Sequence, residues 1–118
     1  MKTIMLVDDS TSIRNILKNA LINEFSIVEA ENGVVALEKI KAHPVNLFLF
    51  DVNMPEMDGL TLLGEVRKLP QHKTTPILML TTETKEELKQ KGRELGASGW
   101  IVKPCEPDRL LGAIRKLI

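Results

Sequence analysis

The chain has 118 residues, of which 43% are hydrophobic and 27% are charged, and its sixteen basic residues balance its sixteen acidic ones. This length and composition predict one soluble globular domain, and the balanced charge argues against nucleic acid or an anionic membrane as a main partner. The single cysteine, Cys105, excludes an internal disulfide, and no stretch reaches the ~18 apolar residues of a membrane span, so we expect a cytoplasmic protein.

Short apolar runs typical of buried strands alternate along the chain with segments of helical periodicity. Strict alternation predicts an α/β fold, a (βα)5 doubly wound parallel five-stranded sheet of the flavodoxin-like order 2-1-3-4-5. The expected strands are 3–7, 26–30, 47–50, 77–80 and 99–102. The expected helices cover 13–21, 34–42, 60–66, 85–95 and 107–117.

Several local signals predict details of these helices. In the first helix, the apolar face at 13–21 includes Ile16 and should be buried. Asp58 is expected to cap the third helix, and Thr84 with Glu87 forms a capping box for the fourth. Residues 31–33 are interpreted as a plain turn. His43 and His72 are expected in surface loops, and no zinc motif is present.

Polar residues stand where the apolar runs end. Asp8 and Asp9 follow the first run, Asp51 follows the third, Thr81 follows the fourth, and Lys103 follows the fifth. The carboxyl ends of parallel strands share one edge of the sheet, so we expect these side chains to meet there. Clustered carboxylates repel one another, and a hard divalent cation such as Mg²⁺ would relieve that repulsion.

The motifs at these strand ends resemble those of one known family. The segments VDDS at 7–10, DVNMPEMDG at 51–59, the turn at 81–82 and VKP at 102–104 are similar to the receiver domain of two-component response regulators. The resemblance covers residues 1–118 as one receiver domain. It is tighter to single-domain chemotaxis regulators of the CheY type, through NMPEMDGL at 53–60 and GASGW at 96–100.

The resemblance implies a phosphorylation site built around Mg²⁺. Asp51 would accept a phosphoryl group from a histidine kinase. The metal would be held by the carboxylates of Asp9 and Asp51, by the main-chain carbonyl of Asn53, and by Asp8 through a water molecule. Lys103 would contact one phosphoryl oxygen and the Thr81 hydroxyl another.

Further roles follow from the same resemblance. A cis Lys103–Pro104 peptide is implied, and an X–Pro bond has only a small trans preference. Asn53 and Glu83 occupy the two positions that tune dephosphorylation in the family. We hypothesise that Thr81 moves toward the phosphoryl group and that Trp100 rotates into the space it leaves. The alternative is that Trp100 only fills space as a large apolar residue.

The resemblance also implies a downstream target protein on the face formed by the fourth helix, the fifth strand and the fifth helix. This face is more charged than in the motor-binding regulator, which leaves the identity of the target open. We expect a monomer that binds neither nucleic acid nor membrane. The residues of this expected partner surface are Lys85, Glu86, Lys89, Arg93 and Trp100.

Several alternatives stay open at this point. The favoured interpretation is a stand-alone receiver that is not an enzyme beyond its own phosphorylation and dephosphorylation. One rival is a Mg²⁺-dependent phosphohydrolase with an aspartyl nucleophile, and another is a receiver excised from a longer regulator. A flavodoxin-like electron carrier is disfavoured because no aromatic pair is available to stack a flavin.

Overall fold

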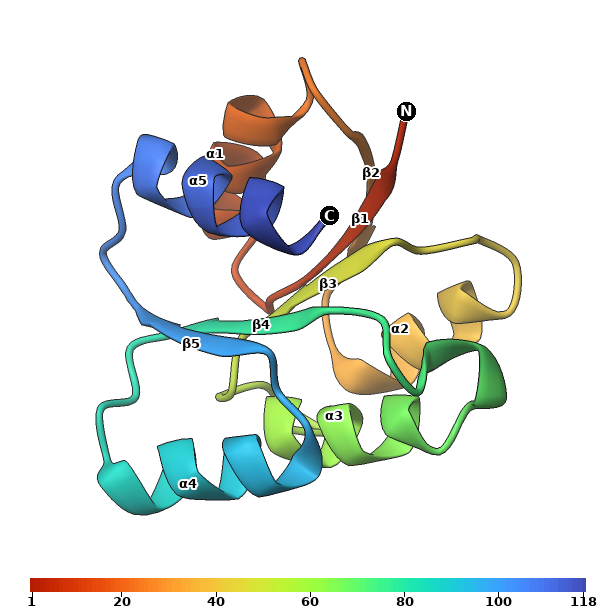
Figure 1. Cartoon of the computed structure of the whole chain (residues 1–118), viewed down its shortest axis with the longest axis vertical. Helices are drawn as coiled ribbons and strands as arrows, with labels where there is room; N and C mark the ends of the chain where they lie inside the picture. The colour runs from red at the N-terminus through yellow and green to blue at the C-terminus, as the bar shows by residue number, and fades with distance from the viewer.

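The computed structural model describes residues 1–118, in which strands and α-helices alternate strictly (Figure 1). A short 3-10 helix, η1 (Pro70–His72), precedes the fourth strand. None of the helices has the length and apolar character that a bilayer crossing requires. The strands are β1 (Thr3–Val7), β2 (Ser26–Ala30), β3 (Leu47–Phe50), β4 (Ile77–Thr81) and β5 (Gly99–Val102). The helices are α1 (Thr11–Leu21), α2 (Gly33–Ile40), α3 (Gly59–Arg67), α4 (Glu86–Leu95) and α5 (Pro107–Leu117).

The five strands form one parallel sheet in the order β2-β1-β3-β4-β5, which confirms the predicted fold class and strand order. The central strands β3 and β4 are apolar along almost their whole length and therefore need cover on both faces of the sheet. Every residue of β3 and β4 is buried, as expected for near-continuous apolar runs. Strand order reverses between β1 and β3, so the crevice of this fold lies at the carboxyl ends of those strands.

Helices cover both faces of the sheet, with α1 and α5 on one side and α2, α3 and α4 on the other (Figure 1). Side chains alternate along β1, so Met5 and Val7 enter one hydrophobic cluster while Ile4 and Leu6 enter the other. The first cluster contains 15 buried residues and the second contains 11. The sheet therefore separates two core layers.

The helix starts agree with the sequence in part. The Asp58 carboxylate accepts a hydrogen bond from Thr61 N at 2.8 Å, so the predicted cap of α3 is confirmed. The plain turn predicted at 31–33 is wrong, because Asn32 caps α2 through a 2.9 Å bond from Val35 N. The capping box predicted at Thr84 is also wrong. The residue before the first turn of α4 is Lys85, one position after Thr84, and it is extended and makes no side-chain cap bond.

Two predicted exposures are reversed. Ile16 was expected in the buried face of α1 but is 60% exposed. The hydrophobic cluster beneath α1 includes Leu21 but does not reach Ile16. His72 was expected on the surface but is only 5% exposed. Its ring packs edge-on against Phe48, with centroids 5.0 Å apart, and its Nδ1 lies 2.8 Å from Thr75 Oγ1. A polar side chain that finds a partner can be buried. His43 is exposed, as predicted.

Candidate functional site

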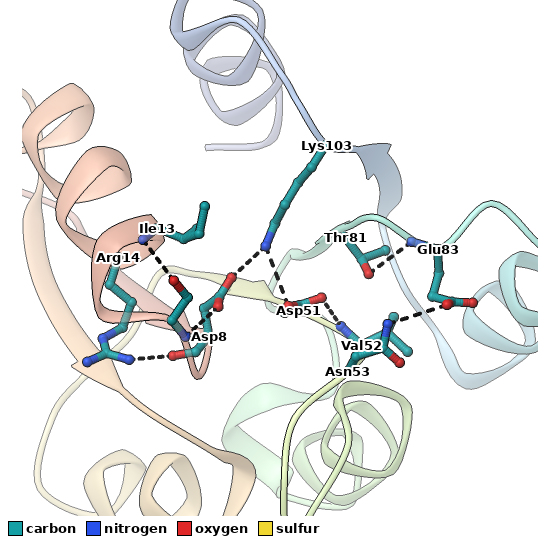
Figure 2. A network of polar contacts seen from close by, with 10 residues as sticks. Asp8, Ile13, Arg14, Asp51, Val52, Asn53, Thr81, Glu83 and Lys103 are labelled. Carbon is teal, nitrogen blue, oxygen red and sulfur yellow. Dashed lines mark hydrogen bonds and ion pairs between the residues drawn. The ribbon is translucent and has the colours of Figure 1, made fainter.

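The register of the sheet brings the predicted polar residues to one edge. Val7 of β1 pairs with Phe50 of β3, and both strands end at these residues. The next residues along the chain, Asp8 and Asp51, therefore leave the sheet side by side. Lys103 follows β5 and reaches across the end of β4 toward both carboxylates (Figure 2).

The Lys103 ammonium bridges two carboxylates. Its Nζ lies 2.7 Å from Asp8 Oδ2 and 3.4 Å from Asp51 Oδ2 (Figure 2). The second oxygen of each carboxylate accepts from the main chain, Asp8 Oδ1 from Ser10 N at 2.9 Å and Asp51 Oδ1 from Val52 N at 2.7 Å. Each carboxylate is thus held at both oxygens, which fixes its orientation at the strand end.

Asp9 completes an acidic cluster with Asp8 and Asp51. One carboxylate oxygen from each residue lies within 4.8 Å of the others. Asp8 is buried, Asp51 is half-buried and Asp9 is exposed, so the cluster opens to solvent on the Asp9 side. Three carboxylates face one ammonium, which leaves the cluster short of positive charge. An all-oxygen donor set with this charge fits a hard cation such as Mg²⁺ and does not fit zinc.

Glu83 connects the other predicted residues of this edge (Figure 2). The hydroxyl oxygen of buried Thr81 accepts from Glu83 N at 3.2 Å. The Glu83 carboxylate accepts from Asn53 Nδ2 at 3.4 Å, and its main-chain carbonyl accepts from Trp100 Nε1 at 3.0 Å. The loop after β4 therefore contacts both the loop after β3, through Asn53, and the half-buried indole on β5.

The structure also places the remaining predicted residues. The Lys103–Pro104 peptide is cis, as the family resemblance implied. A groove of about 400 Å³ between α4 and β5 is lined by Glu86, Lys89, Arg93 and Trp100 together with small residues at 97–99. Lys85 is exposed just before α4 and does not line this groove. Four of the five residues of the expected partner surface thus share one concave patch.

Sequence reasoning missed one residue that contacts the acidic edge. The Arg14 guanidinium on α1 donates to the main-chain carbonyl of Asp8 at 2.5 Å (Figure 2). It also contacts Glu29 on β2 at 3.3 Å. Arg14 and Glu29 lie 15 positions apart, so no local spacing could indicate this contact. Only the pairing of β1 with β2 brings them together.

Comparison with known proteins gives a consistent result. The family described as the response regulator receiver domain matches residues 4–115. The chain is 38% identical over 117 residues to the chemotaxis protein CheY of Bacillus subtilis, covering 98% of this chain and 96% of that protein. It is 40% identical over 116 residues to the transcriptional regulatory protein SrrA of Staphylococcus aureus. That match covers 98% of this chain but only 47% of SrrA, so the chain spans about half of that relative.

Solved structures resemble the whole fold. The chemotaxis protein CheY4 of Vibrio cholerae superposes with a TM-score of 0.96 at 41% identity, covering 100% of this chain and 99% of that one. The response regulator TrrA of Thermotoga maritima, solved in complex with Mg²⁺-BeF, superposes with a TM-score of 0.88 at 34% identity. In that case both chains are covered completely, at 100% each.

Proposed function

This chain belongs to the receiver domains of two-component response regulators and is CheY-like within them, and from this premise we propose that it is a phosphorylation-controlled binding protein whose phosphoacceptor is Asp51. The observation that carries the proposal is the position of Lys103 Nζ, 2.7 Å from Asp8 and 3.4 Å from Asp51, beside a third carboxylate. Such a constellation positions a nucleophile and compensates developing negative charge, as phosphoryl transfer requires.

The proposed reaction is transfer from a phosphohistidine of a histidine kinase. A carboxylate oxygen of Asp51 attacks phosphorus, a new O–P bond forms, and the P–N bond to the imidazole breaks. The electron pair of the P–N bond passes to the released nitrogen, and the proton on the other ring nitrogen makes the leaving group a neutral imidazole. The bonds from Val52 N and Lys103 fix the orientation of the half-buried Asp51 carboxylate, which supports its role as nucleophile.

Mg²⁺ is the proposed cofactor of this step. Asp9, Asp51 and the Asn53 main-chain carbonyl would hold it, with Asp8 contributing through water. When bound, the ion supplies positive charge that offsets the carboxylates and the phosphoryl oxygens. The acidic cluster supports this assignment, as does the likeness to TrrA, which was solved with Mg²⁺-BeF.

The other residues of the edge act on the phosphoryl group. Lys103 would turn its ammonium to a phosphoryl oxygen. The Thr81 hydroxyl accepts from Glu83 N, which leaves its proton available for donation to another phosphoryl oxygen. Asn53 and Glu83 are in contact, and we propose that this pair tunes the loss of the phosphoryl group to water. The chemistry would then be confined to the chain's own phosphorylation and dephosphorylation, in the cytoplasm.

Output would come from the face of α4, β5 and α5. In the proposed switch, Thr81 moves toward the phosphoryl group and Trp100 rotates, which biases the groove between α4 and β5 toward its binding-competent form. The shared contact of Thr81 and Trp100 with Glu83 supports a link between them. We propose that this receiver acts as a monomer and binds a separate target protein through this face.

The test is intact mass spectrometry after incubation with Mg²⁺ and acetyl phosphate. Wild type should gain one phosphoryl group, and Asp51→Ala should gain none. Asp58→Ala is the matched control, because Asp58 caps α3 and lies outside the cluster, so this variant should still be phosphorylated. A wild type that stays unmodified, or an Asp51→Ala variant that is modified equally, would reject the proposal.

A further inference from the structure

The peptide that joins Asp8 to Asp9 is the point at which the chain leaves β1. On the amino side, Asp8 N donates to Ala30 O of β2 at 3.2 Å, which continues the pattern of the sheet. On the carboxyl side, the Asp8 carbonyl accepts from Arg14 Nη1 at 2.5 Å (Figure 2). The plane of this peptide sets the direction in which the Asp9 side chain leaves the main chain. Arg14 therefore contacts the group that orients Asp9.

The Arg14 guanidinium is itself fixed from several sides. Its Nε contacts Glu29 Oε1 at 3.3 Å and its Nη2 contacts Thr11 Oγ1 at 3.4 Å. The Arg14 side chain is only 14% exposed. A planar guanidinium offers several donors in fixed directions, whereas an ammonium is a single point charge on a flexible stem. The three contacts thus need the guanidinium, and lysine could not make them together.

We propose that Arg14 is a positioning residue for the Mg²⁺ site, because it clamps the Asp8–Asp9 peptide between α1 and β2 and so holds Asp9 toward Asp51. This inference rests on the proposed function, since it concerns the metal of that site. Arg14 touches none of the carboxylate oxygens of the proposed metal ligands, and it does not touch the proposed phosphoryl group; its contact is to the main-chain carbonyl of Asp8. It acts through the main chain, in the manner of the outer-shell contacts that orient metal ligands.

Electrostatic repulsion and positioning predict opposite changes in Mg²⁺ affinity when Arg14 is removed. A guanidinium near an acidic cluster repels an incoming cation, so its loss would strengthen Mg²⁺ binding. Loss of positioning would weaken it. The sign of the change in affinity therefore separates the clamp from a general effect of charge.

The test is a titration with MgCl2 followed by amide NMR, with the resonances of Asp9 and Val52 as reporters. Loss of an orienting contact typically lowers metal affinity about tenfold or more. We expect that Arg14→Met raises the Kd by about tenfold and shifts the Asp9 amide before any metal is added. Arg14→Lys should weaken binding in the same direction, and it serves as the second variant if Arg14→Met does not fold.

Lys18→Met is the matched control. Lys18 also contacts Glu29, at 3.6 Å, so this variant removes one positive charge from the same network without touching Asp8. Its Kd should stay close to that of wild type. An Arg14→Met or Arg14→Lys variant that folds and binds Mg²⁺ as tightly as wild type, or more tightly, would overturn the inference, and so would an equal loss in Lys18→Met. If wild type itself binds no Mg²⁺, the proposed function fails instead.

Discussion

Lys103 lies between two carboxylates whose charges would otherwise face each other at the end of the sheet. Its contact to Asp8, at 2.7 Å, is shorter than its contact to Asp51, at 3.4 Å. The lysine is thus bound more tightly to the carboxylate that is not the proposed nucleophile. Of the two carboxylate oxygens that contact Lys103, Asp51 Oδ2 is therefore the more weakly bound.

His72 is a buried polar residue that packs against Phe48 of β3, and its burial should make stability depend on pH. Burial lowers the pKa of the His72 imidazole below its ordinary value of 6.5, and the positive charge of Arg67 lowers that pKa further. Between the lowered pKa and 6.5 the unfolded chain binds more protons than the folded one. The free energy of unfolding should therefore rise with pH in this window and fall on acidification below 6.5.

Urea unfolding of wild type and His72→Gln at pH values from about 5.5 to 7.5 measures this contribution. The substitution should reduce the slope of unfolding free energy against pH below the ordinary histidine pKa. His43→Gln is the control, because His43 is exposed and should leave the slope unchanged. Equal slopes in wild type and His72→Gln would contradict the assignment.

Whether the sequence predicted the position of a single residue depended on whether local or distant segments determine that position. Asp51 could be located because a buried apolar run must end at a sheet edge, and the register then delivers the carboxylate there. His72 could not, because its burial depends on Phe48 and Thr75 in other segments. Residue type predicts exposure only on average.

Among the elements, α4 is held by a side chain of another helix at its carboxyl end and lacks a side-chain cap at its amino end. At its carboxyl end, Gly96 adopts a left-handed conformation with φ of 102°, and its carbonyl accepts from Arg67 Nε at 3.2 Å and from Nη2 at 2.7 Å. At the amino end, Lys85 makes no side-chain cap bond. The amino end, which adjoins the Glu83 loop of the proposed site, is therefore the less constrained end.

Two glycines in helices test how closely α4 packs on Trp100. A Cβ added to Gly92 of α4 would lie 3.0 Å from the nearest indole carbon, whereas one added to Gly112 of α5 would meet nothing within 4 Å. Alanine is favoured over glycine in a helix interior by about 0.5–1 kcal/mol. Gly112→Ala should raise the free energy of unfolding by about that amount.

Gly92→Ala should gain none of this stabilisation, because the indole and α4 must move apart to admit the methyl group. The fluorescence emission of Trp100, the only tryptophan, should shift in this variant and stay unchanged in Gly112→Ala. Urea unfolding and emission spectra measure both effects. An equally stabilised Gly92→Ala with an unshifted spectrum would show that α4 does not pack tightly on the indole.

Element boundaries were less predictable than element types. A capping box is a local signal, but the segment before α4 is extended and tied by Glu83 to Trp100 on β5, so the helix starts after Lys85 and not at Thr84. The periodicity of α1 likewise located an apolar face but not its width. Ile16 lies on the part of that face which no other element covers.

For the whole molecule, Mg²⁺ binding should be visible as thermal stabilisation. A ligand that binds only the folded state at about ten times its Kd adds about 1.4 kcal/mol. For a domain of this size, that raises the thermal midpoint by roughly 5 °C. Calorimetry with and without MgCl2 measures the shift. The Asp9→Asn variant should lose most of this increase in the thermal midpoint. If NaCl of matched ionic strength raised the midpoint of wild type equally, the effect would not be specific to the site.

The order of the strands was the most predictable feature of the molecule, because alternating strands and helices admit few parallel arrangements. That arrangement has a consequence for mutational additivity. The sheet separates a cluster that contains Val66 from one that contains Ile114, and no residue belongs to both clusters. Substitutions in opposite layers share no side-chain neighbours, so their energetic effects should add without coupling. Helix residues of one layer should therefore be variable without re-optimising the helix residues of the other layer.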